Sequence, residues 1–203
     1  MKKRQRTLTR LMLIMTSLVV ISLLVTSFFV REYIKKREDE VIRQKIYSTA
    51  KLISNDKQVK DDIKHHRQTL GIQKFANRVM DESGTDFVVI MDETFTRYTH
   101  PKTELIGEKF SNIEDVSSTF TIGDHYSRQT GHLGEGLRFF TAIKDEDGEN
   151  IGVVCVGYTK ETVKKQVLHS QEKILFGLLI GIAVAITLAV VYNRRLKRIL
   201  LNY

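Results

Sequence analysis

The chain has 203 residues, 32 of them Lys or Arg and 24 Asp or Glu, and a formal net charge of +8. Nine basic residues lie within residues 1–10 and 194–198, whereas the other 23 share residues 31–173 with all 24 acidic residues. The excess positive charge therefore belongs to the two ends of the chain, which argues against a nucleic-acid-binding surface. The single cysteine, Cys155, excludes an internal disulfide framework, and its apolar surroundings predict a small buried residue.

Two long apolar segments, residues 11–30 and 174–192, predict membrane-spanning helices. Each lacks charged residues and is long enough to cross a hydrocarbon core of about 30 Å at about 1.5 Å per residue. A cleaved signal peptide is the alternative for the first segment. Its apolar core would normally be only about 7–15 residues long and would be followed by a small-x-small cleavage site, which "TSFFVREY" lacks. We therefore expect a retained anchor.

The charged flanks of these segments predict their orientation. Five basic residues precede the first segment and four follow the second, and positive flanks stay in the cytoplasm. We expect a two-pass protein of the cell membrane with a cytoplasmic N-terminus (1–10), two transmembrane helices (11–30 and 174–192), an extracytoplasmic domain (31–173) and a cytoplasmic stub (193–203). The outer segment is large enough for one domain with a hydrophobic core.

Helical periodicity begins the outer domain. Apolar residues recur at helical spacing over residues 37–52, and no glycine or proline separates this stretch from the first span. The stripe at Ile42, Ile46 and Ile53 could pack on the domain's own sheet or on a second copy, which would make the protein a homodimer. A second helix is predicted over residues 68–80, ended by the turn residues of "DESGTD".

After these helices the pattern changes to that of strands. "FVVIM" (87–91) is typical of a strand buried on both faces, and "ETFTRYT" (93–99) predicts another after a tight turn. "LRFFTAI" (137–143) and "IGVVCVGY" (151–158) predict a hairpin. Residues 111–136 are less regular, and we expect loops, one short helix and one more strand there. Helices followed by an antiparallel sheet indicate an α+β fold, and residues 159–173 predict a helix that continues into the second span.

Two arginines stand out in the predicted strands. In "LRFFTAI", Arg138 and Phe140 share one face, opposite an apolar one. An edge arginine that reaches solvent or pairs with a carboxylate is the alternative to a ligand-binding role. Arg97 and His100 lie on opposite faces if the strand is regular, so both contact one ligand only if the strand ends between them. Pro101 favours such an end, because it cannot donate to a sheet ladder. A surface arginine and a satisfied loop histidine remain the alternatives.

Two segments carry a family resemblance. "TDFVVIMDETFTRYTHPKTELIGEKF" and "GHLGEGLRFFTAIKDEDGENIGVVCVGY" resemble the extracytoplasmic sensor domain of the citrate and C4-dicarboxylate sensor histidine kinases. The resemblance implies a PAS-like (PDC) fold, with long N-terminal helices behind a central antiparallel sheet and a ligand cup in front. It implies that a small carboxylate is bound by five residues: Arg97, His100, Phe110, Arg138 and Phe140.

The same resemblance bears on the ligand. In the citrate-binding branch, the position of Phe140 resembles a lysine that serves a third carboxylate, so fumarate, succinate or malate is favoured here over citrate. His132 stands where the family usually has Ser or Thr, and Gly136 where it has Ser. His132 either replaces the lost donor or points outward.

The expected function is a transmembrane receptor that signals through its second span to a cytoplasmic histidine kinase and a response regulator. Residues 193–203 contain neither a phospho-accepting helix nor an ATP-binding segment, so we expect the sensor part and not the enzyme. A solute-binding accessory of a carboxylate transporter and a chemoreceptor are the alternatives. No nucleophile–base pair, metal-ligand spacing or cofactor motif stands out, and no cofactor is expected.

Overall fold

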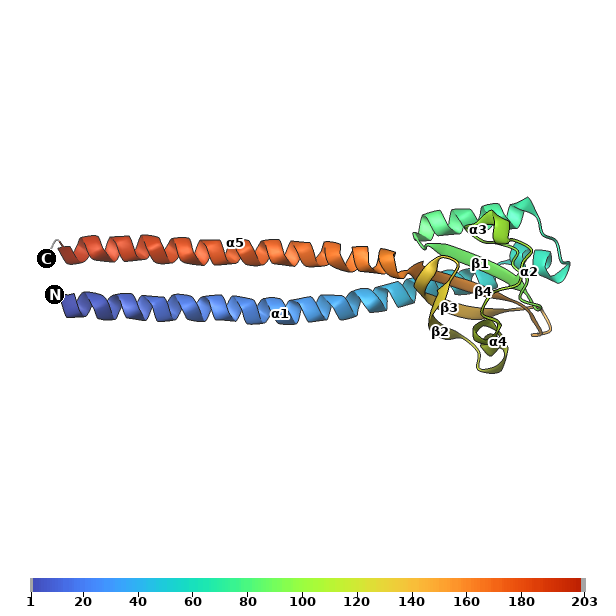
Figure 1. Cartoon of the computed structure of the whole chain (residues 1–203), viewed down its shortest axis with the longest axis horizontal. Coiled ribbons are helices and arrows are strands. Elements are labelled where there is room, and N and C mark those ends of the chain that lie inside the picture. Colours follow the sequence, from blue (N-terminus) through green and yellow to red (C-terminus); the bar gives the residue numbers. More distant parts are fainter. Residues whose placement is uncertain (1, 202–203) are drawn as a thin grey trace. The chain divides into compact units, whose positions relative to one another are not determined.

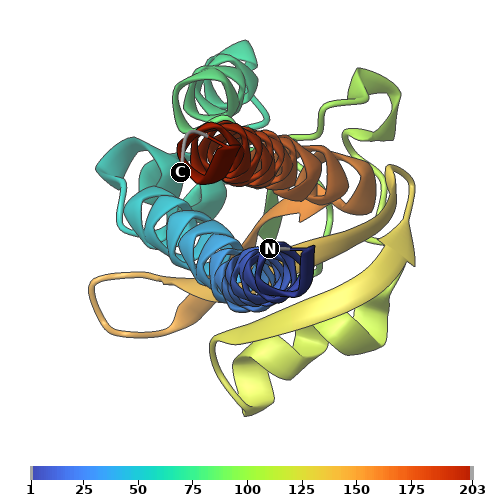
Figure 2. The ribbon, with the colours of Figure 1, turned by 90° about the vertical axis from the view of Figure 1, so that its left-hand side faces the viewer.

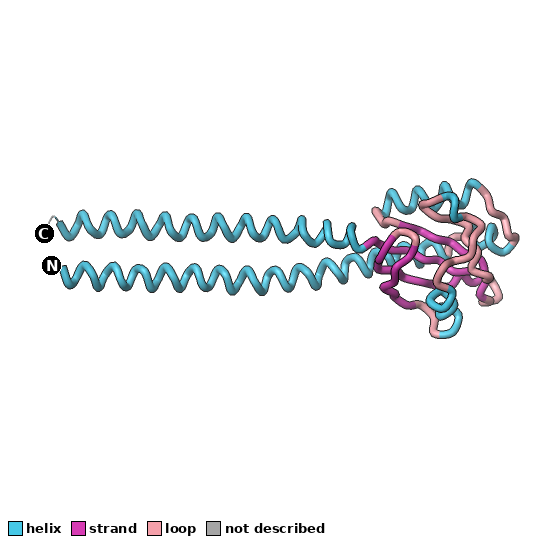
Figure 3. The backbone as a smooth tube through the Cα atoms, viewed as in Figure 1, coloured by secondary structure: helices cyan, strands magenta, loops and turns pink. Residues whose placement is uncertain are grey.

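The computed structural model describes residues 2–201, which divide into two compact units. One unit consists of the residues up to Glu38 and those from Gln166 onward, and the other is Asp39–Lys165. Each of the two long helices, α1 (Lys2–Ser54) and α5 (Lys160–Leu201), contributes to both units, whereas all four strands belong to the second (Figure 1, Figure 3). The unbroken α1 confirms that the helix predicted after residue 37 continues from the first apolar segment.

Parts of both long helices are long and apolar enough to cross a membrane. The most apolar window of Thr9–Ser54 has a mean hydropathy of 2.5, and that of Lys160–Arg195 has 2.9. Large apolar side chains in these windows are exposed, among them Leu13 and Phe176, as expected for a surface that faces lipid. The exact limits of the two spans stay a prediction.

Four antiparallel strands form one sheet in the order β1-β4-β3-β2. β1 (Phe87–Asp92), β3 (Gly134–Lys144) and β4 (Asn150–Thr159) are the predicted apolar strands, and β3 and β4 form the predicted hairpin. Every residue of β1 is buried, as expected for an apolar run that is covered on both faces. β2 (His125–Gly131) is the additional strand expected before β3. The α+β fold is thereby confirmed.

Three helical segments cover one face of the sheet, and α4 lies on the other (Figure 2). The end of α1 packs there together with α2 (Lys57–Lys64) and α3 (Leu70–Ser83). Ile42, Ile46 and Ile53 of α1 are buried in this core. The stripe therefore serves the chain's own sheet, and it no longer supports a homodimer.

The opposite face of the sheet carries a smaller core. Side chains of β1, β3 and β4, such as Val89, Phe140 and Cys155, pack there against α4 (Ile113–Thr121). The 3-10 turn η1 (Thr103–Leu105) belongs to the long connection between β1 and α4. This face lies between the sheet and that connection, and it contains the candidate site.

The strand predicted over residues 93–99 is wrong, because only isolated bridges occur there. Asp92 Oδ1 accepts hydrogen bonds from the backbone N–H groups of Thr94 and Thr96, each at 2.9 Å. Phe95 has a φ of 64°, a left-handed conformation that cannot continue a strand. The chain therefore coils back directly after β1, and Arg97 follows this coil.

Candidate functional site

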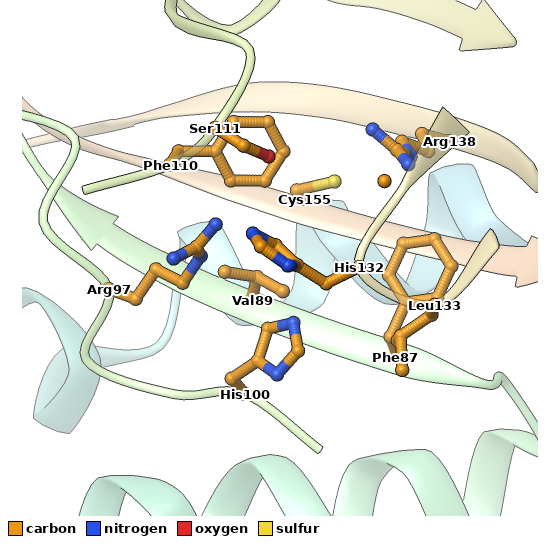
Figure 4. Close-up of a pocket in the computed structure, with 11 residues that line it drawn as sticks. Phe87, Val89, Arg97, His100, Phe110, Ser111, His132, Leu133, Arg138 and Cys155 are labelled. Carbon is orange, nitrogen blue, oxygen red and sulfur yellow. The ribbon is translucent and has the colours of Figure 1, made fainter. Parts of the chain in front are cut away.

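A small cavity lies between the sheet and the connection from β1 to α4 (Figure 4). It contains about 30 Å³ of free space, which is room for roughly two water molecules. Its walls are Phe87, Val89, Arg97, His100, Phe110, Ser111, Gly131, His132, Leu133, Arg138 and Cys155. Four of the five predicted site residues are therefore brought together in one cavity, although the first and last of them, Arg97 and Arg138, lie 41 positions apart in the sequence.

Arg97 is buried in this wall without a polar partner. Its backbone is held on both sides, since its N–H donates to Glu108 O at 3.0 Å and its carbonyl accepts from Gly107 N at 2.8 Å. The side chain is only 1% exposed, and its Nε and Nη1 atoms have no hydrogen-bond partner among the described residues. The Phe110 ring lies 5.4 Å from the guanidinium carbon. Burial lowers the pKa of Arg97, an effect that the charge of Glu108 opposes. A buried charged guanidinium without a partner is energetically costly, and a bound anion would compensate this cost.

His100 is positioned by α3. The Gln73 side chain accepts a hydrogen bond from the His100 N–H at 3.0 Å and donates one to the His100 carbonyl at 3.1 Å. The pKa of His100 is lowered to about 4, mainly by burial. A backbone hydrogen bond to Lys102 opposes this shift, and the nearby charges of Arg97, His132 and Lys102 add to it. Nδ1 lies 3.0 Å from Lys102 N and 3.1 Å from Lys102 O, so this nitrogen can accept from the one or donate to the other, and Nε2 is correspondingly a donor or an acceptor.

Arg138 approaches the cavity from β3. It pairs with Gly157 of β4 on one side and with Ser127 of β2 on the other. The side chain is 5% exposed, and its guanidinium carbon lies 6.0 Å from the centre of the Phe87 ring. Gly157 leaves the room that the Phe87 ring occupies, since a Cβ there would lie 2.5 Å from Phe87 Cζ.

The two predicted phenylalanines have different positions. Phe110 lines the cavity, whereas Phe140 does not. The Phe140 ring lies behind that of Phe110, with ring centres 5.9 Å apart, and is stacked on His125 on its other side. Phe140 is fully buried, so it supports the wall and does not form it. The strand pattern correctly put Phe140 on the face of Arg138, but it did not reveal the layer of side chains in front.

Sequence reasoning missed several wall residues. Val89 and Cys155 pair across β1 and β4, and their side chains lie on the face of Arg138, so strand alternation could have identified them. Cys155 is buried as predicted, and burial raises the pKa of its thiol to about 12. His132 lines the cavity and is also exposed, and Gly136 does not line the cavity.

The charges of the cavity are unbalanced. Its wall contains two arginines and no carboxylate, and among the described residues neither Arg97 nor Arg138 forms an ion pair. The described residues also contain no cluster of three or more His, Cys, Asp or Glu that could hold a metal ion. Guanidinium groups grip carboxylates through paired hydrogen bonds. The arrangement therefore suits a small organic dianion.

Comparison with known proteins identifies similar sequences. The family described as single cache domain 3 matches residues 33–172. A protein named "Probable C4-dicarboxylate sensor kinase" from Bacillus subtilis (strain 168) is 27% identical over 181 residues, which are 89% of this chain and 34% of that protein. The sensor histidine kinase DcuS of Escherichia coli (strain K12) is 27% identical over 86% of this chain and 32% of its own length. The chain thus spans about a third of the length of these relatives.

A solved structure supports the same comparison. The sensor domain of E. coli DcuS superposes with a TM-score of 0.59 at 27% identity, covering 64% of this chain and 96% of that domain. The match therefore includes nearly the whole of that sensor domain. The PDC-like fold expected from the sequence is confirmed.

Proposed function

The chain belongs to the single cache domain 3 family, and on this premise we propose that its outer domain binds a small carboxylate and signals through α5 across the membrane. A four-carbon dicarboxylate such as succinate, fumarate or malate is the favoured ligand, and citrate the second. The observation that carries the proposal is the buried guanidinium of Arg97, which has unpaired donors in a cavity that also contains Arg138.

The chemistry of the site fits a dianion held at both ends. Arg97 and Arg138 each bind one carboxylate, and His100 adds a hydrogen-bond donor. Charge-assisted hydrogen bonds contribute roughly 1.5–3 kcal/mol each, less the cost of ordering, which corresponds to micromolar to millimolar affinity. Phe110 covers the carbon skeleton, and Phe140 supports Phe110 from behind.

A route from the site to α5 begins at Phe87, which contacts both the cavity and Gly157. The neighbouring Asp86 carboxylate accepts hydrogen bonds from the N–H and hydroxyl of Thr159, both at 2.7 Å, and from the hydroxyl of Thr162 at 3.1 Å. Thr159 ends β4 and directly precedes α5, and Thr162 lies in the first turn of α5. A carboxylate stabilises a helix at its N-terminus. A ligand that draws Arg138 away from Phe87 displaces this cap. Such a displacement requires the ligand to favour one of two states of the domain.

Topology and partners complete the proposal. Both termini lie in the cytoplasm, the spans are residues 11–30 and 174–192, and the domain of residues 31–173 faces outward. In the cytoplasm, α5 leads to a histidine kinase and its response regulator. The relatives are named sensor kinases, and the part that they share with this chain is the sensor portion.

Isothermal calorimetry on the full chain in nanodiscs tests the proposal, with succinate, fumarate, malate and citrate as ligands. Wild type should bind at least one of them, and Arg97→Ala and Arg138→Ala should each weaken binding by about tenfold to hundredfold. Arg128→Ala is the matched control, because Arg128 is an exposed arginine of β2 that pairs with Asp39. Absence of binding by wild type, or equal binding by all three variants, would contradict the proposal.

A further inference from the structure

Only a side chain that lines the cavity can discriminate directly between carboxylates of different size. Phe140 cannot exclude a larger carboxylate directly, because it lies behind Phe110 and is fully buried. The cavity is small, with about 30 Å³ of free space. A wall residue that moves when a ligand binds changes the space that is available, so the least firmly held wall residue is the candidate.

Most of the wall is firmly held. Val89 and Cys155 belong to the centre of the sheet and are buried. The segment before Pro101 is tied to β1, since Tyr98 N donates to Ile90 O at 2.7 Å, and its last residue, His100, is held at both backbone groups by α3. These parts cannot retreat without breaking buried hydrogen bonds, which cost about 1–3 kcal/mol each when a partner is left unpaired.

The tip of the β2–β3 hairpin is held less firmly. Gly131 pairs with Gly134, so His132 and Leu133 form the two-residue turn that covers the cavity. The side chain of His132 is exposed, and no hydrogen bond of its ring is found among the described residues. Its carbonyl accepts one hydrogen bond, from Lys102 Nζ at 3.1 Å. Figure 4 shows the imidazole among Arg97, His100 and Arg138.

We propose that the imidazole of His132 sets the size of the carboxylate that this site admits, and that it is a specificity-determining residue. The proposal rests on the function proposed above. Rotation of the ring toward solvent frees space between the two guanidinium groups while the turn itself stays in place. The freed space accepts a short dicarboxylate, and the displaced ring still covers the mouth of the cavity. A branched tricarboxylate needs that covered space as well and binds more weakly.

Two substitutions separate the size of the ring from its hydrogen bonding. His132→Ala removes both, whereas His132→Phe keeps a ring of similar size and removes the polar atoms. Calorimetry on the full chain in nanodiscs measures the affinity ratio of succinate to citrate. We expect His132→Ala to lower the affinity ratio of succinate to citrate by about tenfold or more, as is common when the size of a pocket changes. His132→Phe should keep this ratio within about threefold of the wild-type value. His65→Ala, an exposed histidine of a different loop, should leave the ratio unchanged.

Three results overturn the inference while wild type still binds succinate. They are an unchanged ratio in His132→Ala, equal loss of both ligands in His132→Ala and His132→Phe, and a wild-type preference for citrate. Failure of wild type to bind any of the carboxylates is a different result, because it overturns the proposed function itself and the inference with it.

Discussion

Replacement of Arg97 by methionine should stabilise the ligand-free protein and abolish its response to ligand. The side chain is 1% exposed, and two of its nitrogen atoms lack partners. Each unsatisfied buried donor costs about 1–3 kcal/mol, and the ring of Phe110 at 5.4 Å compensates about 0.5–2 kcal/mol of this cost. Methionine fills a similar volume without polar atoms. The expected net gain in the free energy of unfolding is on the order of 1–3 kcal/mol.

Urea denaturation of the full chain in nanodiscs, followed by tyrosine fluorescence, measures this change. Succinate at a hundredfold excess over its Kd should stabilise wild type by about 2.7 kcal/mol and should leave Arg97→Met unchanged. Arg128→Met is the control, because its guanidinium lies at the surface. A variant that loses several kcal/mol and still responds to succinate would refute the reasoning, since it would mean that Arg97 is a structural cation and not a ligand-binding one.

Three further predictions concern stability and coupling. Because the pKa of His100 is about 4 in the fold against 6.5 ordinarily, only the unfolded state gains its proton between these pH values. The free energy of unfolding should therefore fall by up to about 3 kcal/mol as the pH drops from 6.5 to 4, and urea titrations of His100→Gln should lack this slope. Gly157→Ala should lower the free energy of unfolding by about 2 kcal/mol or more, because its Cβ would clash with the Phe87 ring. The control Gly71→Ala in α3 should change the free energy of unfolding by less than about 1 kcal/mol. A small effect of Gly157→Ala would contradict the packing described. Asp86→Ala should leave succinate affinity within about threefold while removing the ligand-dependent change in amide exchange at the start of α5; an unchanged exchange response would show that the signal takes another route.

The sequence predicted the elements whose pattern is strong. β1 and the β3–β4 hairpin follow from apolar runs rich in β-branched residues, and α1 follows from a helical period without glycine or proline. α2 was missed because its eight residues are too few to show a period. The segment after β1 was assigned to a strand because its residue types favour one. The left-handed Phe95 and the Asp92 turn prevent that strand, and both depend on local hydrogen bonds that composition does not reveal.

The candidate site was predicted in part for similar reasons. Alternation along β3 identifies the face of Arg138, and the family resemblance adds Arg97, His100 and Phe110. The position of Phe140 behind Phe110 depends on how two segments pack, which neither pattern contains. The position of His132 in the cavity wall depends on the hairpin turn, which the strand pattern does not place.

The most direct test of a site that binds two carboxylates compares two ligands on the unchanged wild-type protein. Calorimetry on the wild-type chain in nanodiscs compares succinate with butyrate, which has the same number of carbon atoms and one carboxylate fewer. If Arg97 and Arg138 each bind one carboxylate, butyrate loses one paired contact of about 3 kcal/mol and binds about a hundredfold more weakly. Equal affinity for the two ligands would contradict the proposed dianion site.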